Sequence, residues 1–187
     1  TVALGGVSYG EALLRTAADQ IKNGIAGVIG RSVSIETHQD FVRAVHRPQR
    51  PGKSPSGQTV DYLVLNYDTV LEDALALERV PFADGLDGGV TGWWSPQTFN
   101  RTDLAARVFK LHGSINWCEF PDDPLPRRVG DRLQIAGVKE RRILIWPAST
   151  KYREAQLDPF AQLTERARRV RLADAGGEEA HQGDNAQ

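Results

Sequence analysis

The pattern of hydrophobic and polar residues predicts a strand, a polar turn and a helix over Val60–Leu77. Asp61–Leu65 is a short, almost continuously apolar segment, which is typical of a strand inside a parallel sheet. The apolar run stops at the polar turn Asn66–Asp68. A helix is predicted over Thr69–Arg79, and the Asp68 side chain can cap its first turn. The segment therefore predicts one strand-to-helix unit with polar side chains at the strand end.

A second predicted strand ends in polar residues in the same way. Val108–Leu111 is followed directly by His112, Gly113 and Ser114. Forty-six residues separate Asn66 from His112, which is room for one helix and a long connection. Ligands of open α/β sheets bind beyond the carboxyl ends of the strands, so we expect Asn66 and His112 to meet at one crevice.

The rest of the chain alternates between helical and extended patterns. Further helices are predicted over Glu11–Ile29, Glu36–Arg47 and Asp158–Leu172, and further strands over Ile115–Phe120, Arg132–Ala136 and Arg142–Trp146. The first helix carries one apolar stripe, formed by Leu14, Ala17, Ala18, Ile21, Ile25 and Val28. This alternation predicts a layered α/β domain over residues 1–172 with a mostly parallel sheet.

The second predicted helix and the loop after it receive ordinary structural interpretations. Phe41 and Val42 are expected to face the core, Thr37 to cap the helix, and both His38 and His46 to lie in solvent.

The loop over residues 47–58 contains Gly52-Lys53-Ser54. It lacks the earlier glycine of a phosphate-binding loop and precedes a strand, so that function is rejected. A basic loop close to a ligand remains the alternative to a plain loop.

The long connection Val80–Thr102 is rich in aromatic residues. Trp93, Trp94 and Phe99 are expected to pack the core of a small insertion, and the alternative is that they wall a pocket.

Composition limits the classes of function. The chain has 187 residues, of which 40% are hydrophobic and 25% charged, and its formal net charge is −1. These values are typical of a soluble globular protein and provide no field that attracts nucleic acid. No apolar run is long enough to span a bilayer. The single cysteine, Cys118, excludes a disulfide framework and a cysteine-based zinc site, so we expect a cytoplasmic protein without a metal.

The two ends suggest that the chain is a fragment. It begins with Thr1 and contains no Met, and the polar segment at residues 173–187 is predicted to be disordered. The Gly-rich start, Thr1–Gly10, is interpreted as a plain turn, with a pyrophosphate-binding turn as the alternative. We therefore expect a domain that is incomplete at both ends.

The residue types at the two strand ends suggest a chemistry. A neutral histidine such as His112 accepts a proton from a hydroxyl or a water at physiological pH. The Asn66 amide can hold a water, a ribose hydroxyl or a carboxamide through its donor and acceptor. Gly113 lets a ligand approach the backbone closely. A structural asparagine turn and a histidine satisfied within the fold are the alternative interpretation.

Two segments, LNYDTVLEDAL and FKLHGSINW, resemble the paired signature of bacterial sirtuin-like domains. The later stretch ILIWPASTKYREAQLDPFAQL also resembles that family, and the similarity covers about residues 60–167. Such domains bind NAD and are common in NAD hydrolases of anti-phage defence. The segment comparable with the family's Gly-rich phosphate loop is Leu4–Ser8.

The resemblance implies a Rossmann-like, three-layer domain that acts on NAD. Asn66 and His112 would be the catalytic residues, and Asp68, Gly113 and Ser114 would bind the dinucleotide. The implied reaction is hydrolysis of the nicotinamide–ribose bond of NAD, and the implied partner is NAD or an ADP-ribose-like ligand. An effector or sensor domain outside this chain and a homo-oligomer are compatible with the family. The alternative is a non-catalytic module for nucleotide sensing or protein interaction.

Overall fold

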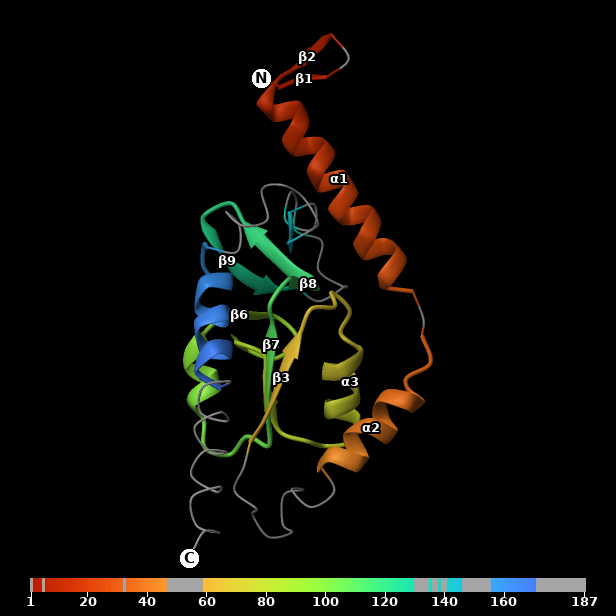
Figure 1. The fold of residues 1–187 in the computed structure, drawn as a ribbon, viewed down its shortest axis with the longest axis vertical. Helices are drawn as coiled ribbons and strands as arrows, with labels where there is room; N and C mark the ends of the chain where they lie inside the picture. The colour runs from red at the N-terminus through yellow and green to blue at the C-terminus, as the bar shows by residue number, and fades with distance from the viewer. Residues whose placement is uncertain are drawn as a thin grey trace, which may run out of the picture.

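Two β-sheets form the body of the molecule, with helices beside them (Figure 1). The structure is a computed structural model and describes residues 2–4, 6–31, 33–46, 59–129, 135, 138, 141–145 and 156–170. Its helices are α1 (Glu11–Ile29), α2 (Glu36–His46), α3 (Val70–Leu77), the 3-10 helix η2 (Pro96–Asn100) and a helix at residues 160–170. Its strands are β1 (Val2–Leu4), β2 (Val7–Tyr9), β3 (Val60–Val64), β4 (Phe82–Ala83), β5 (Leu86–Asp87), β6 (Gly92–Trp94), β7 (Ala106–Lys110), β8 (Gly113–Phe120), β9 (Asp123–Arg128) and β10 (Arg142–Leu144).

A parallel sheet of three strands, in the order β3-β7-β4, is the centre of the fold. β3 and β7 run parallel in an unbroken register from Val60 opposite Ala106 to Val64 opposite Lys110. Both strands therefore end at the same edge, as expected. β3 lies at the border of this sheet, so Leu63 on that strand stays exposed instead of buried.

Side chains pack on both faces of the parallel sheet, and the two faces of β7 belong to two different cores. Ala106 and Val108 belong to a core that includes side chains of α2 and α3. Phe109 points the other way, into a core formed with η2 and the helix at residues 160–170. Successive side chains of a strand alternate between its faces, so one strand joins both cores. The α/β fold class is confirmed, with the layered arrangement of a Rossmann-like domain.

The second sheet is antiparallel and was not predicted. Its five strands lie in the order β10-β8-β9-β6-β5, so the expectation of a mostly parallel sheet holds only for the three central strands. β8 follows β7 after two residues and then turns back into β9, and short hairpins of this kind produce antiparallel pairing. β9 contains Pro124 and Pro126. Because proline is rare within strands, the sequence pattern does not predict a strand there. The hairpin strand predicted at Arg132–Ala136 lies outside the described residues except for Ile135.

The first helix has the predicted bounds but not a buried face. Ile21 is 46% exposed and Val28 is 62% exposed, although both belong to the predicted apolar stripe. Figure 1 shows α1 passing beside the antiparallel sheet, where it contacts β10, towards the hairpin of β1 and β2 at its far end. The described residues of the Gly-rich start, 2–4 and 6–10, thus include an antiparallel hairpin, which lies far from the ends of β3 and β7.

Three expectations for α2 were wrong. His46 is buried, and its Nε2 lies 2.7 Å from the Tyr62 hydroxyl. Burial lowers the pKa of His46 and raises the pKa of Tyr62 to about 12. Phe41 is exposed, and Thr37 lies inside the helix instead of capping it. His38 is exposed as expected.

The expectation that the aromatic residues of the long connection pack in a core is confirmed for two of them and wrong for the third. Trp94 and Phe99 pack in a core, whereas Trp93 is exposed. The loop at residues 47–58 and the segment at 173–187 lie outside the described residues. Among the helices that the structure describes, none combines the length and the apolar character needed to cross a bilayer.

Candidate functional site

The turn after β3 is held by a buried lysine from β7. The Lys110 side chain is fully buried, and its Nζ donates a hydrogen bond to the backbone carbonyl of Asp68. The same Nζ lies 3.3 Å from Glu72 Oε1 on α3. One ammonium group thus joins the polar turn, the helix that follows it and the neighbouring strand. This contact fixes the backbone that carries Asn66.

Tyr67, the middle residue of the turn, ties it to the antiparallel sheet. Its carbonyl accepts hydrogen bonds from the Ile115 amide at 2.9 Å and from Ser114 Oγ at 3.3 Å. Its hydroxyl donates to the carbonyl of Ile145, beyond β10. Burial raises the pKa of Tyr67. The turn is therefore anchored from both sheets.

Asp68 supports the start of α3, but it lies one residue before the N-cap, Thr69, whose own side chain makes no capping hydrogen bond. Asp68 Oδ1 accepts a hydrogen bond from the Val70 amide at 3.1 Å. This bond satisfies one of the amides that have no partner within a helix at its N-terminus.

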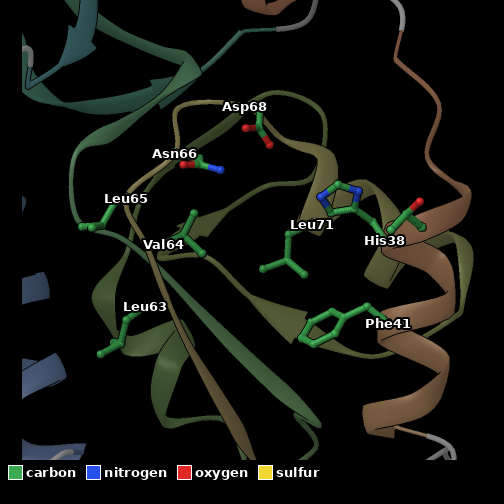
Figure 2. A pocket seen from close by; sticks show the side chains of 9 residues that line it. His38, Phe41, Leu63, Val64, Leu65, Asn66, Asp68 and Leu71 are labelled. Atoms are coloured by element: carbon green, nitrogen blue, oxygen red, sulfur yellow. The ribbon is translucent and has the colours of Figure 1, made fainter.

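A cavity of about 600 Å³ opens beside the turn, along the free edge of β3. Figure 2 shows Asn66 and Asp68 at one end of it, and side chains of α2 and α3 opposite. It is lined by Thr37, His38, Phe41, Leu63, Val64, Leu65, Asn66, Asp68 and Leu71. The wall is mostly apolar with a few polar groups, which is the usual character of a small-molecule site.

His112 lies near this turn but does not line the cavity that contains Asn66. Its ring centre is 6.4 Å from that of Tyr67, and its carbonyl accepts a hydrogen bond from the Ile145 amide at 2.9 Å. The structure thus brings Asn66 and Asp68 together at one cavity and leaves His112 outside its lining, beside the ring of Tyr67. A shared role of Asn66 and His112 stays a prediction.

Gly113 and Ser114 have structural contacts that account for their identity. Gly113 has a φ of 85°, and a Cβ atom there would lie 2.1 Å from the backbone oxygen of Ile143. Ser114 is buried, and its hydroxyl bonds to Tyr67. Their expected contact with a dinucleotide also stays a prediction.

The buried pair of Lys110 and Glu72 was missed in the sequence. A signal for Lys110 was present, because period-two alternation places it on the same face of β7 as Ala106 and Val108. Glu72 gave no such signal, since it lies in the first turn of α3, where an acidic residue is common on a solvent face.

The surroundings of Glu72 change its acidity. Burial raises the pKa of Glu72 from its ordinary value near 4.5 to about 7, although the nearby Lys110 acts in the opposite direction. Asp84 adds a smaller upward effect on the pKa of Glu72. A buried carboxyl whose pKa lies near neutral pH can accept or donate a proton under physiological conditions.

Glu72 is expected to make stability fall as pH rises. Between about pH 4.5 and pH 7 the unfolded chain releases a proton that the folded chain retains, and this costs up to about 3 kcal/mol of the free energy of unfolding. The measurement is urea unfolding of the protein and of Glu72→Gln at about pH 4 and pH 8. The free energy of unfolding of the native chain, relative to that of Glu72→Gln, should be lower at the higher pH by about this amount. Parallel pH profiles would contradict the raised pKa.

Among the described residues, no group of three or more His, Cys, Asp or Glu side chains is placed to hold a metal ion.

The fold and its strand-end turn define a Rossmann-like α/β domain. Residues 61–144, somewhat less than half of the chain, match the family model of the SIR2-like domain. This match covers β3, the Asn66–Asp68 turn, α3 and β7 to β10, and it assigns the segment to the sirtuin-like family. The family generally binds NAD. A search of curated proteins finds no match to this chain.

Proposed function

We propose that this chain is the core of an NAD-binding domain that hydrolyses the nicotinamide–ribose bond, within anti-phage defence in the bacterial cytoplasm. The observation that carries the proposal is the position of Asn66. It lies at the carboxyl end of a parallel strand, at the mouth of a mostly apolar cavity, in a segment that matches the SIR2-like domain. An effector or sensor domain outside this chain would use the product or the loss of NAD.

The cavity beside Asn66 suits one aromatic ring of a dinucleotide. Its volume of about 600 Å³ falls in the range of small-molecule sites. The apolar side chains of Leu65 and Leu71 offer a surface for a planar ring, and the Asn66 amide can pair with a carboxamide through a donor and an acceptor. These features support binding of the nicotinamide end of NAD.

Each proposed catalytic residue has a separate task. Asn66 would hold the attacking water or a ribose hydroxyl, and His112 would accept a proton from it. Asp68 would support the pocket for the ring. Because the glycosidic bond of NAD is labile in itself, the residues mainly need to position the ligand and stabilise developing charge.

The alternative is a module that binds the nucleotide without cleaving it. One observation favours it: His112 does not line the cavity that contains Asn66. The hydroxyl of Ser114 also donates a hydrogen bond to the carbonyl of Tyr67, so this proposed dinucleotide-binding group already has a partner within the fold.

Turnover of a fluorogenic etheno-NAD analogue is expected in the native chain. Asn66→Ala and His112→Ala should each reduce the rate by roughly 100- to 10,000-fold, the usual effect of removing a general base or a residue that positions the nucleophile. Asn100→Ala is the matched control, because Asn100 is exposed on η2, does not line the cavity beside Asn66, and has a side chain that accepts a hydrogen bond only from the exposed Arg166 among the contacts described. Unchanged turnover in both site variants would disprove the catalytic assignment.

Calorimetric titration with NAD and with ADP-ribose separates the two functions. Binding that is weakened by Asn66→Ala, without turnover, supports the sensing module. Failure of both ligands to bind excludes both functions.

A further inference from the structure

One face of α1 is apolar and lies in solvent. It is formed by Leu14, Ala17, Ile21, Gly24 and Val28, all of which are exposed. These residues follow one another in alternating steps of three and four, so they form a single seam along the helix. This seam is the outer face of α1. A helix of this kind is usually held by the packing of its apolar face, so the exposed seam requires an explanation.

The opposite side of α1 is the one that meets the rest of the described structure. Ala26 is its buried residue, and the polar residues Asp19 and Asn23 are half-buried beside it. Ile25 and Ile29, at the border of this side, are half-buried as well. The helix thus meets the fold partly through polar residues while its seam faces solvent. This is the reverse of the usual arrangement of a surface helix.

Gly24 gives a second indication that the outer face is covered. Glycine in the interior of a helix is destabilising relative to alanine. The described fold does not require it, because a Cβ atom at Gly24 would meet no atom within 4 Å and its φ is not positive. A glycine inside a helix often serves close packing. The space beside Gly24 therefore suits a side chain that the described residues do not supply.

The order of large and small residues along the outer face fits a second copy of the same helix. When two copies lie antiparallel, with their two-fold axis level with Asp19, a large side chain meets a small one in every layer. The layers are Leu14 with Gly24 of the second copy, Ile21 with Ala17, and Val28 with Gly10 before the helix. A parallel pair would place each large residue against its own copy and would leave the layer of Gly24 empty.

The charges of α1 are compatible with this pairing. The outer face carries no charged residue, and Glu11 at the start of the helix forms an ion pair of 2.7 Å with Arg15 of the same helix. Antiparallel packing also places the partial positive charge of each N-terminus beside the partial negative charge of the other C-terminus. Two copies of the helix therefore attract each other at both ends.

We propose that the outer face of α1 is a homodimer interface, at which two copies of the helix pack antiparallel with their two-fold axis level with Asp19. The large residues of each copy occupy the space beside the small residues of the other. The interface uses neither Asn66 nor His112, so the proposal does not depend on the function proposed above.

The size of the interface sets its expected strength. An apolar stripe about 100° wide on a helix about 28 Å long covers roughly 250–400 Å² on each copy. Stable complexes bury about 1,200–2,000 Å² in total, so the helix pair alone is smaller than a permanent interface. Val7 in the hairpin and Val33 after α1 are both exposed, and the antiparallel arrangement brings them towards each other at both ends. We therefore expect a reversible dimer.

Sedimentation velocity of the 187-residue chain at concentrations up to about 100 µM should show this reversible dimer. Ile21→Asp should raise its dissociation constant by roughly 100-fold, because the symmetric seam loses two isoleucine side chains and receives two carboxylates. Leu77→Asp is the matched control, since Leu77 is an exposed aliphatic residue of another helix, α3. The control should leave the dissociation constant unchanged.

Gly24→Leu tests the antiparallel arrangement. Leucine favours a helix more than glycine does, and a Cβ at this position meets no atom of the chain, so the monomer should lose no thermal stability. In the dimer the new side chain collides with Leu14 of the second copy and raises the dissociation constant by about tenfold or more. Adding Leu14→Ala exchanges the large and the small residue of this layer, so the double variant should return to within about threefold of the native constant.

Each outcome decides the proposal. A dimer that is weakened by Ile21→Asp and by Gly24→Leu, and recovered by the double variant, supports it. A native chain that stays monomeric assigns the outer face to a different partner and overturns it, as does a dimer that Ile21→Asp leaves unchanged. A dissociation constant that Gly24→Leu leaves unchanged or lowers overturns it too, since a parallel pair would gain contact there. Circular dichroism checks that the variants, all at exposed positions, are folded.

Discussion

Gly113→Ala is expected to lower the free energy of unfolding by about 4 kcal/mol or more, through two separate effects. The residue has a φ of 85°, which costs an L-amino acid about 1–2 kcal/mol. The added Cβ would also lie 2.1 Å from the backbone oxygen of Ile143. A backbone atom cannot rotate away as a side chain can, so β10 has to move off β8. In thermal unfolding the midpoint should fall by roughly 8–16 °C.

Gly89→Ala is the matched control for the second effect. Gly89 also has a positive φ, of 68°, but a Cβ there meets no atom within 4 Å. Gly89→Ala should therefore lower the free energy of unfolding only by the cost of the positive φ, about 1–2 kcal/mol. If the two variants unfold at the same temperature, the close approach of Ile143 does not decide the identity of residue 113.

Lys110→Ala is expected to destabilise the protein by about 3–5 kcal/mol, because it removes one member of a buried charge pair. Glu72 would stay buried without the ammonium 3.3 Å away, and the carbonyl of Asp68 would lose its donor. The turn that carries Asn66 would be loosened at the same time. Urea unfolding measures the stability.

Replacing both members of the pair tests whether charge or volume causes the loss. The double variant Lys110→Met with Glu72→Met keeps apolar volume and leaves no unpaired charge, so it should recover much of the stability. A double variant that is as unstable as Lys110→Ala would show that the hydrogen bond to the Asp68 carbonyl is the main contribution of Lys110.

The two predictions concern one short motif, KLHGS, at residues 110–114. Lys110 holds the turn after β3, Gly113 allows β10 to approach, and Ser114 bonds to Tyr67. Most of this motif therefore has a structural task in the described fold, whereas the contact described for the His112 side chain is with the ring of Tyr67. This separates the proposed proton acceptor from the residues that build its surroundings.

Local patterns predicted the elements that carry the candidate site. The apolar run before Asn66 and the hydrogen bond that Asp68 accepts at the start of α3 both depend on residues close in sequence, so they were enough to place β3 and α3. The order of the remaining strands could not be predicted from such local patterns. β9 contains two prolines, and its pairing with β8 depends on a hairpin, not on a periodic pattern.

Side-chain environments depended on contacts that no local pattern encodes. His46 has the same helical surroundings as His38 in sequence, yet it is buried against Tyr62 while His38 is exposed. The apolar stripe of α1 predicts burial, but Ile21 and Val28 stay exposed because little of the described structure covers that side of the helix.

The sequence by itself determined the two strand ends, the polar turn Asn66–Asp68 and the α/β class, because these follow from periodicity and from capping over a few residues. Only the tertiary structure decided which polar residues meet. Lys110 and Glu72 are far apart in the chain, and β7 and α3 bring them together beneath the turn. The same packing leaves His112 outside the lining of the cavity that contains Asn66. Distances between residues remote in sequence are set by packing, so sequence patterns do not contain them.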